Sequence, residues 1–325
     1  MAYMAFFRKF NKIRYFAELS VLVLLFIQIT PATATSMRLY PLSSQVVGGE
    51  VQYTVKTDDT LGLIASRHGL ERDDLAIQTH TNPDYKVAHI WVGEVLSFSN
   101  RHIVPYPMKK GLLLNVAQRM LFSFQNGNVI DAYPFAAGVP TWKTPFGVFN
   151  IINKVANPTW FVPKNIQAEL EAEDRAVETK VPPGPDNPLG KYWLGLSIGG
   201  IGIHGTIVDA NIYRYESHGC VRLLPEDIKK LYAQVKVGDS GEIIYEPVLL
   251  AKTEDGKIWL EVDNDVYAMW PYDDFDYVKA LLQAHHLEDK VNWKKIKEVI
   301  NQKLAVAEDV SSSLPVEVVE KKGHS

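Results

Sequence analysis

The only cysteine of this 325-residue chain lies close in sequence to two histidines. Cys220 follows His218 by two positions, and His204 lies sixteen residues upstream, far enough to return on a neighbouring strand or turn. A cysteine is a nucleophile only as the thiolate, and an adjacent imidazole can take its proton. The spacing therefore predicts a nucleophilic site with Cys220 as the attacking thiol and His204 as the base.

Small residues flank both predicted groups, with Gly205 after the base and Gly219 before the thiol. Glycines at these positions let the backbone approach a reacting carbonyl closely. The amides of His218, Gly219 and Cys220 lie on the turn that carries the thiol. They could donate to a developing oxyanion, and removing one such donor costs roughly 3–4 kcal/mol. Thiol, base and amide donors together predict an acyl-transfer site.

Other interpretations of these residues are weaker. Singly, the thiol could be a packed core residue and each histidine a surface one, but neither explains all of them together. A zinc site of Cys220, His204 and His218 lacks an apparent fourth ligand, although catalytic zinc needs only three. A papain-like protease has its cysteine before its histidine, the reverse of the order here. In the pair His285 and His286, adjacent side chains point to different helix faces, which favours solvation. We predict no metal and no cofactor.

The composition is that of an ordinary globular protein of two domains, with a small third. Apolar residues make up 46% and charged residues 22% of the chain, and the formal net charge is −4. There is no basic stripe to neutralise phosphates, so nucleic acid is excluded as a partner.

Residues 1–34 have the pattern of a secretory signal peptide. Four basic side chains precede an apolar run over 19–29, and Ala32-Thr33-Ala34 has the form of a cleavage signal. The run is short of the roughly 20 residues of a membrane-spanning helix, so an uncleaved anchor is the lesser alternative. Export predicts a periplasmic location and an oxidising compartment, where an unpaired cysteine calls for an explanation.

The sequence from residue 50 onward divides into five parts. Residues 50–99 predict a strand, two short helices and a strand, and the prolines in 100–110 indicate a linker. Residues 111–247 have closely spaced turn signals between β-branched and aromatic residues, which predicts a mostly antiparallel sandwich or barrel. Residues 248–305 predict a hairpin followed by two helices. The polar residues 306–325 are expected to be disordered. The fold class is therefore mainly β, with a small N-terminal αβ module and a small C-terminal α+β appendage.

The 50–99 module resembles LysM, a domain that binds glycan strands of N-acetylglucosamine type. The likeness rests on Tyr53-Thr54-Val55, Asp59-Thr60-Leu61, Ile64-Ala65, Asn82-Pro83 and Trp91-Val92-Gly93. The sequence departs from that pattern at Ser97-Phe98-Ser99. A small αβ cap without glycan affinity is the alternative.

The motif at the predicted site resembles the signature of L,D-transpeptidase catalytic domains of the YkuD type. His204-Gly205-Thr206 and Ser217-His218-Gly219-Cys220-Val221-Arg222-Leu223 carry the likeness. It extends through Thr144 to Phe149, Asn157 to Trp160, Val181 to Gly190 and Val237 to Asp239. With the flanking parts, the chain is similar to the Gram-negative ErfK/YbiS type. The resemblance implies a β-sandwich and enzymes that remodel peptidoglycan.

Carried over by position, the resemblance implies that Cys220 is the nucleophile and His204 the base, oriented by the Gly205 carbonyl. His218 and Gly219 would shape the oxyanion pocket. Arg222 and Ser217 would bind substrate, although an ordinary structural salt bridge is an equal alternative for the arginine. The thiol would also form a covalent adduct with a carbapenem.

The implied reaction has two steps. Cys220 attacks the carbonyl of the L-centred diamino acid in a tetrapeptide stem of peptidoglycan and releases the terminal D-alanine. An amine of a second stem, or a lysine of an outer-membrane lipoprotein, then takes the acyl group. Transfer to water, which is L,D-carboxypeptidase action, and non-catalytic peptidoglycan binding remain alternatives.

Overall fold

The computed structural model describes residues 37–79 and 90–312. The predicted signal peptide, 1–34, and the last thirteen residues of the predicted tail lie outside the described residues. Within the described ranges, no helix is both long and apolar enough to cross a membrane.

The N-terminal module has the predicted order of strand, two helices and strand, and its strands pair antiparallel. Its core is formed by apolar residues of both helices and of the closing strand, among them Ile64, Leu75 and Phe98. Thr60 caps the first helix by accepting a 3.1 Å hydrogen bond from the Leu63 amide. The elements are β2 (Glu50–Thr54), α1 (Leu61–Arg67), α2 (Arg72–Gln78) and β3 (Val95–Ser99).

The predicted linker at 100–110 is instead part of the folded body, so that prediction is wrong. β4 (His102–Ile103) pairs with β1 (Val46–Val47), and His102, Ile103 and Val104 are all buried. The physical reason is the apolar pair Ile103-Val104, which packs in the interior, while the His102 ring is held by Glu261 at 2.7 Å. The two prolines of this segment suggested a linker and gave no indication that its first residues are buried.

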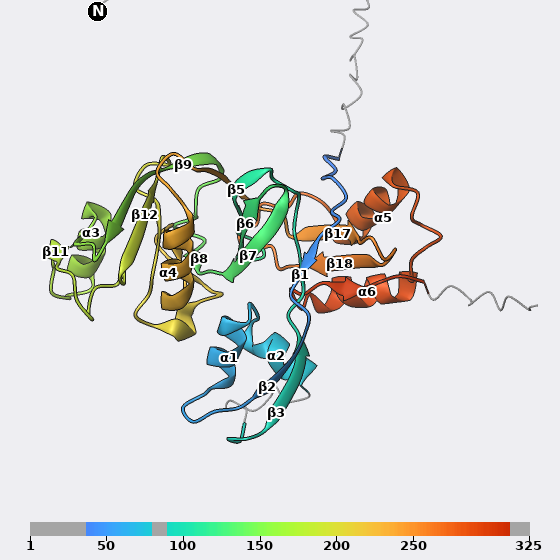
Figure 1. Cartoon of the computed structure of the whole chain (residues 1–325), viewed down its shortest axis with the longest axis horizontal. Coiled ribbons are helices and arrows are strands. Elements are labelled where there is room, and N and C mark those ends of the chain that lie inside the picture. The colour runs from blue at the N-terminus through green and yellow to red at the C-terminus, as the bar shows by residue number, and fades with distance from the viewer. Residues whose placement is uncertain (1–36, 80–89, 313–325) are drawn as a thin grey trace, which may run out of the picture. The chain divides into compact units, whose positions relative to one another are not determined.

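The catalytic-motif domain is built on one curled, eight-stranded sheet in the order β15-β13-β12-β9-β16-β5-β6-β7 (Figure 1). Most neighbours are antiparallel, as predicted, but β16 with β5 and β13 with β15 are parallel. The strands are β5 (Lys110–Asn115), β6 (Met120–Gln125), β7 (Asn128–Pro134), β9 (Gly147–Ala156), β12 (Tyr192–Leu196), β13 (Gly202–His204), β15 (Val221–Arg222) and β16 (Ser240–Ile244).

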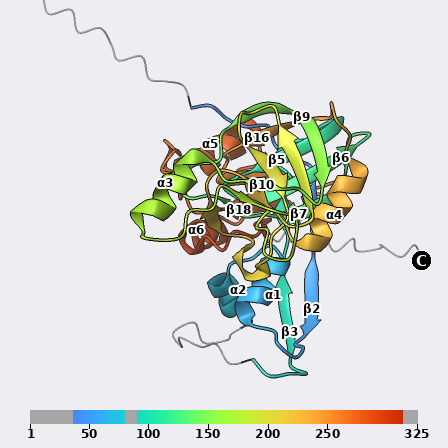
Figure 2. The same ribbon diagram turned by 90° about the vertical axis from the view of Figure 1, so that its left-hand side faces the viewer.

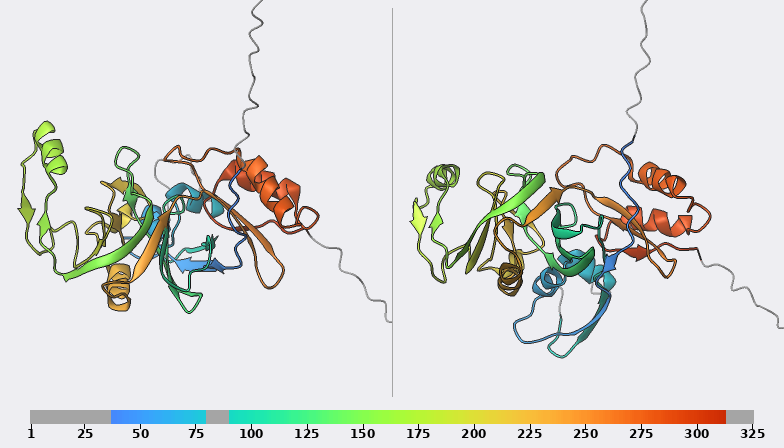
Figure 3. Two further views of the ribbon diagram at one scale, coloured as in Figure 1. Left: turned by 90° about the horizontal axis from the view of Figure 1, so that it is seen from above. Right: turned by 45° about the horizontal axis from the view of Figure 1, so that its top comes forward.

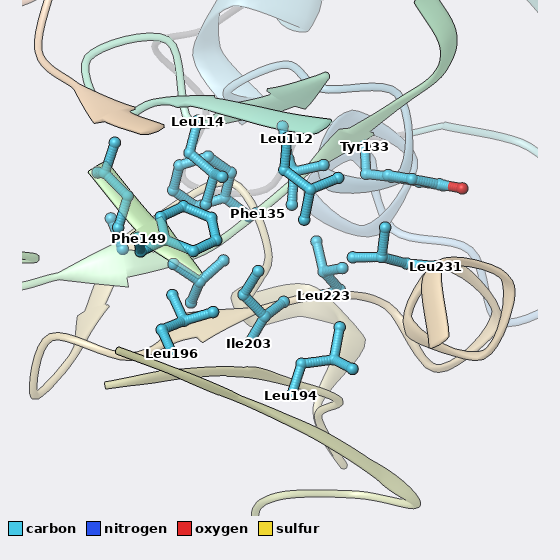
Figure 4. Close-up of a cluster of buried hydrophobic side chains, with 14 of the residues drawn as sticks. Leu112, Leu114, Tyr133, Phe135, Phe149, Leu194, Leu196, Ile203, Leu223 and Leu231 are labelled. Carbon is cyan, nitrogen blue, oxygen red and sulfur yellow. The ribbon is translucent and has the colours of Figure 1, made fainter. Parts of the chain in front are cut away.

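Because the sheet curls, strands from its two ends bury their side chains in a single core (Figure 4). Leu112 and Phe135 come from the β5–β7 end, and Leu194 and Ile203 from the β12–β13 end. The helix α4 (Pro225–Gln234), with Pro225 at its first turn, adds Ile228 and Leu231 to this core. The prediction of a mainly β fold is confirmed. The strands on both sides of the core belong to one curled sheet.

A long excursion leaves the sheet after β9 and returns at β12. It contains β10 (Trp160–Phe161), α3 (Lys164–Ala172) and β11 (Lys180–Val181), followed by the proline-rich loop over 181–190. Both views in Figure 3 show α3 standing out from the sheet. Three shorter elements complete the domain: β8 (Ala137–Gly138), the 3₁₀ turn η1 (Asp209–Asn211) and β14 (Tyr215–Ser217).

The C-terminal part is the predicted hairpin with two helices on it, seen beside the sheet in Figure 1 and behind it in the view of Figure 2. Its elements are β17 (Val248–Lys252), β18 (Ile258–Val262), α5 (Asp274–Ala284) and α6 (Trp293–Gln302). The prediction that disorder begins at 306 is wrong for residues 306–312. β19 (Glu308–Asp309) pairs with β18, and Val306, Ala307 and Val310 are buried. The segment is polar on average, but these few apolar residues fill positions in the core.

Candidate active site

The sheet register brings the predicted base and nucleophile onto neighbouring strands. β13 and β15 run parallel, with Ile203 opposite Val221 and His204 opposite Arg222. Neighbouring strands lie about 4.8 Å apart, and residues two apart on a strand share a face. Cys220, two positions before Arg222 and at the entry to β15, is therefore on the same face of the sheet as His204. Ile203 and Val221 point the other way and are buried in the core.

The turn that carries the thiol is held by a serine. Ser217 is only 1% exposed, and its hydroxyl accepts a 3.1 Å hydrogen bond from the Gly219 amide while donating to the Cys220 carbonyl. Gly219 has φ of +102°, a backbone conformation that other residues rarely adopt. The hydroxyl is thus used inside the turn, and a contact of Ser217 with substrate stays a prediction.

The same contact changes the predicted set of oxyanion donors. Because the Gly219 amide already donates to Ser217, it is engaged in this structure. The amides of His218 and Cys220 remain predicted donors. Gly219 contributes in another way, since its positive φ strains any other residue and a Cβ there would press on Ile201 Cδ1 at 3.1 Å.

The thiol is shielded and uncharged at neutral pH. Cys220 Sγ contacts the Gly200 carbonyl at 3.8 Å, in the loop between β12 and β13. Burial raises the pKa of the Cys220 thiol, and the Gly202 amide and the Arg222 charge oppose that rise. These two groups therefore favour the thiolate when it forms.

The imidazole of His204 is oriented by its own neighbour. His204 is 4% exposed, and its Nδ1 lies 2.7 Å from the Gly205 carbonyl. A carbonyl only accepts, so Nδ1 carries the proton and Nε2 carries the free lone pair. Burial and repulsion from Arg222 lower the pKa of His204 to about 3, although the hydrogen bond to Gly205 acts to raise it. The ring is therefore neutral at neutral pH and has an atom ready to accept a proton.

Arg222 has the position that the resemblance implies for a substrate contact. It faces His204 across the ladder, and its backbone is fixed by two hydrogen bonds to Ala136, at 2.9 and 3.0 Å. Its Nε is buried without a partner among the described residues. The contact with substrate stays a prediction, but the Arg222 charge lowers the pKa of both the thiol and the imidazole.

The His218 side chain faces α3. Its Nε2 lies 2.6 Å from Glu169 Oε2, and its ring packs edge-on against Trp142 at 5.3 Å. It also lines a cavity of about 940 Å³. The other walls of this cavity are β10, α3, the segment over 173–180 and the proline-rich loop over 181–188. A role for His218 in shaping the oxyanion pocket stays a prediction.

A tyrosine from the C-terminal part supports the site and was not foreseen from the sequence. The buried Tyr267 hydroxyl donates to Gly138 O at 2.7 Å and accepts from the Thr144 amide at 3.1 Å. Its backbone carbonyl accepts a 2.8 Å hydrogen bond from Lys143 Nζ. The loop over 138–144 packs closely on the thiol turn: a Cβ added to Gly138 would lie only 3.0 Å from Gly219 Cα. No sequence motif marks Tyr267, since the contact is formed only by folding.

Metal ligands are not gathered in the part of the chain that the structure describes: no group of three or more His, Cys, Asp or Glu side chains is placed to hold an ion. The chemistry that the site supports is acyl transfer through a thiol, with a neutral imidazole to accept its proton.

Comparisons with known proteins agree with this chemistry. Residues 109–249 match the YkuD family, described as the L,D-transpeptidase catalytic domain. The chain is 30% identical over 292 residues to a Salmonella typhimurium protein named "Probable L,D-transpeptidase ErfK/SrfK", covering 87% of this chain and 93% of that protein. It is 33% identical over 233 residues to the Escherichia coli K12 protein named "Probable L,D-transpeptidase YbiS", covering 69% and 74%.

Among solved structures, the catalytic domain of an Enterococcus faecium L,D-transpeptidase acylated by ertapenem is similar at 21% identity and a TM-score of 0.33. The match covers 42% of this chain and 98% of that one. The likeness to the Salmonella protein spans nearly the whole of both sequences and includes the strands that carry Cys220 and His204. This chain belongs to the YkuD family of L,D-transpeptidases.

Proposed function

We propose that this chain is a peptidoglycan L,D-transpeptidase that acts on tetrapeptide stems. The observation that carries the proposal is the parallel pairing of β13 with β15, which places His204 opposite Arg222 and brings Cys220, at the entry to β15, beside β13. Two observations support a stem peptide as substrate: the family is described as the L,D-transpeptidase catalytic domain, and a cavity of about 940 Å³ adjoins the thiol turn at His218.

In the first step Cys220 Sγ attacks the carbonyl carbon of the L-centred diamino acid. Both groups are neutral beforehand, so the thiol proton passes to His204 Nε2 as the sulfur–carbon bond forms. The Gly202 amide and the Arg222 charge favour the negative sulfur at that moment. Collapse of the tetrahedral intermediate breaks the amide bond, His204 returns the proton to the leaving nitrogen, and D-alanine departs as the free amine. A thioester remains on Cys220.

In the second step an amine attacks the thioester carbon. The carbon–sulfur bond breaks as the amide bond forms, and the proton of the amine passes through His204 to the departing Cys220 sulfur. The side-chain amine of a second stem gives a cross-link, and a lysine of an outer-membrane lipoprotein gives a covalent anchor. Water would give only a shortened stem. The acidic residues Glu169, Glu173, Glu178 and Asp186 on the cavity wall outnumber the basic residues Arg175 and Lys180 there. This excess of negative charge supports an amine acceptor, because it would attract an ammonium group.

We further propose that the chain is exported to the periplasm and that its αβ module contacts glycan strands. The signal-like pattern of residues 1–34 supports export. The module has the strand, helix, helix, strand order that the LysM resemblance implies. Sedimentation of the full chain with purified sacculi tests the contact, using Cys220→Ala to prevent turnover. Retention that is unchanged after Trp91→Ala would count against a contact through that end of the module.

Product analysis tests the reaction. Purified chain is incubated with disaccharide-tetrapeptides, and the products are separated and weighed by mass spectrometry. We expect a dimer that has lost one D-alanine. A tripeptide alone indicates carboxypeptidase action. Unchanged substrate, with a lipoprotein-derived lysine peptide also present as acceptor, would contradict the proposal. Cys220→Ala is the control and should leave the tetrapeptide intact.

A further inference from the structure

The sheet face that carries the base also carries an indole beside it. Trp193 on β12 lies opposite His204 on β13, and the two rings stack with centroids 5.8 Å apart and planes 23° apart. β13 lies between β12 and β15 in the sheet. The indole therefore covers the imidazole on the side away from Cys220 and Arg222.

Two glycines make room for this indole and its partner. A Cβ on Gly202 would lie 2.3 Å from Trp193 Cη2, so the six-membered ring rests directly on the Gly202 backbone. The indole Nε1 donates to Asn153 Oδ1 at 3.1 Å. Asn153 in turn lies over Gly195, where a Cβ would be 2.6 Å from its Oδ1. The ring is thus held at both ends.

The same indole therefore touches two parts of the reacting centre: the base, by stacking, and the backbone of Gly202, which faces the Cys220 sulfur. From this geometry we propose that Trp193 is a positioning residue, which fixes the plane of the His204 ring and the β13 backbone beside the thiol. The proposal rests on the proposed acyl-transfer function and adds to it a residue outside the catalytic motif.

Two physical effects follow from the contact. Offset stacking of two aromatic rings is worth about a two- to tenfold change in a rate that depends on ring orientation. The indole also keeps water from one side of the imidazole, which disfavours its charged form. The other titratable or charged groups that the structure places around the ring, Arg222 and Cys220, both lie on the β15 side.

The test is a double-mutant cycle read by acylation. The second-order rate of ertapenem acylation is measured by intact mass for the full chain, Trp193→Leu, Gly202→Ala and the double variant. We expect a two- to tenfold loss for Trp193→Leu. Gly202→Ala should lower the acylation rate by at least as much, because the added methyl group displaces the indole. In the Trp193→Leu background the same change should cost nothing more. Equal losses from Gly202→Ala in both backgrounds would overturn the proposal.

Conservative variants separate positioning from a merely structural role. Trp193→Phe keeps a ring on the imidazole and should recover most of the rate. Asn153→Leu removes the indole acceptor and should give a smaller loss than Trp193→Leu. Val155→Ala, at an exposed position paired with Trp193 on the β9 side, should leave the rate unchanged. A loss that is the same for Phe and Leu at position 193 would contradict stacking.

A titration gives a second, independent readout. Water reaching the imidazole in Trp193→Leu should raise the pKa of His204, so the acid limb of the acylation profile moves to higher pH. NMR of the His204 Cε1–H detects the same shift without any acylation. An unchanged His204 titration in Trp193→Leu overturns the proposal even if ertapenem does not react. If the native chain neither reacts nor turns over stems, but the titration moves, the proposed function fails and the positioning contact stands.

Discussion

Tyr267 and Gly138 are 129 positions apart in the chain and are joined by a 2.7 Å hydrogen bond, in which the phenol donates to the glycine carbonyl. The same oxygen accepts from the Thr144 amide at 3.1 Å. One buried side chain from the C-terminal part thus holds both ends of the loop over 138–144, and that loop packs on the thiol turn at Gly219. The C-terminal part is therefore a support of the active site.

Tyr267→Phe should weaken both the fold and the site. The change leaves a buried carbonyl and a buried amide without their partner, which costs about 1–3 kcal/mol for each unsatisfied group. We expect a lower free energy of unfolding in urea and a several-fold slower ertapenem acylation. Tyr272→Phe is the matched control, because its hydroxyl accepts only from the exposed Arg38 amide at 3.0 Å. Equal acylation rates for the two variants would contradict a support role for Tyr267.

The contact between His218 and Glu169 predicts coupling between the thiol turn and α3. If His218 acts through this 2.6 Å pair, His218→Gln and Glu169→Gln should each lower kcat/KM for stem peptides by about two- to fivefold, since an exposed ion pair is worth at most ~1 kcal/mol. The double variant should be no worse than the worse single one. The measurement is steady-state kinetics with a tetrapeptide stem.

High salt should reduce the difference in kcat/KM between the native chain and Glu169→Gln, because screening weakens a partly exposed ion pair. Glu171→Gln, an exposed charge removal on the same helix, serves as the control. A much larger loss for His218→Gln than for Glu169→Gln would support the prediction that the imidazole shapes the oxyanion pocket.

Arg222 should control the pH dependence of the thiol. Its charge lowers the pKa of Cys220, whose rise is mainly due to burial, so Arg222→Gln should raise that pKa further. The fraction of thiolate at a given pH then falls, and the alkaline rise in alkylation rate moves to higher pH. Iodoacetamide reports on Cys220 alone, because the chain has a single cysteine.

The same substitution should raise the pKa of His204 from its low value, since Arg222 also repels the imidazolium. Arg214→Gln removes another nearby charge, one that pairs with Glu216 at 3.5 Å, and should leave the alkylation profile in place. A shift of the Cys220 profile to lower pH in Arg222→Gln would show that the charge does not act as described.

The sequence predicts those parts of the site whose chemistry is local. Cys220, His204 and the glycines are marked by residue type and spacing, and the Gly205 contact lies next to the base in the chain. Side-chain direction is set by packing, so the hydrogen bonds of Ser217 and the direction of His218 toward α3 could not be predicted. Trp193 and Tyr267 depend on strand register and on a contact between distant segments, and neither has a motif.

In the fold, too, features set by local sequence could be predicted and those set by contacts between distant segments could not. Alternation and turn residues predict the strands of 111–247, and apolar spacing predicts α4, α5 and α6. The order of strands in the curled sheet, with β16 between β9 and β5, is decided by long-range pairing. The linker and tail predictions failed because a few apolar residues, such as Ile103 and Val306, are enough to bury a segment that looks polar or proline-rich.

Trapping the acyl-enzyme tests the central claim, that Cys220 receives the stem acyl group. The full chain is mixed with disaccharide-tetrapeptide, quenched in acid within the first turnovers and analysed by intact mass and peptide mapping. We expect an added mass equal to the stem less D-alanine, located on the peptide that contains Cys220 and absent in Cys220→Ala. An adduct on another residue, or one that persists in Cys220→Ala, would contradict the account.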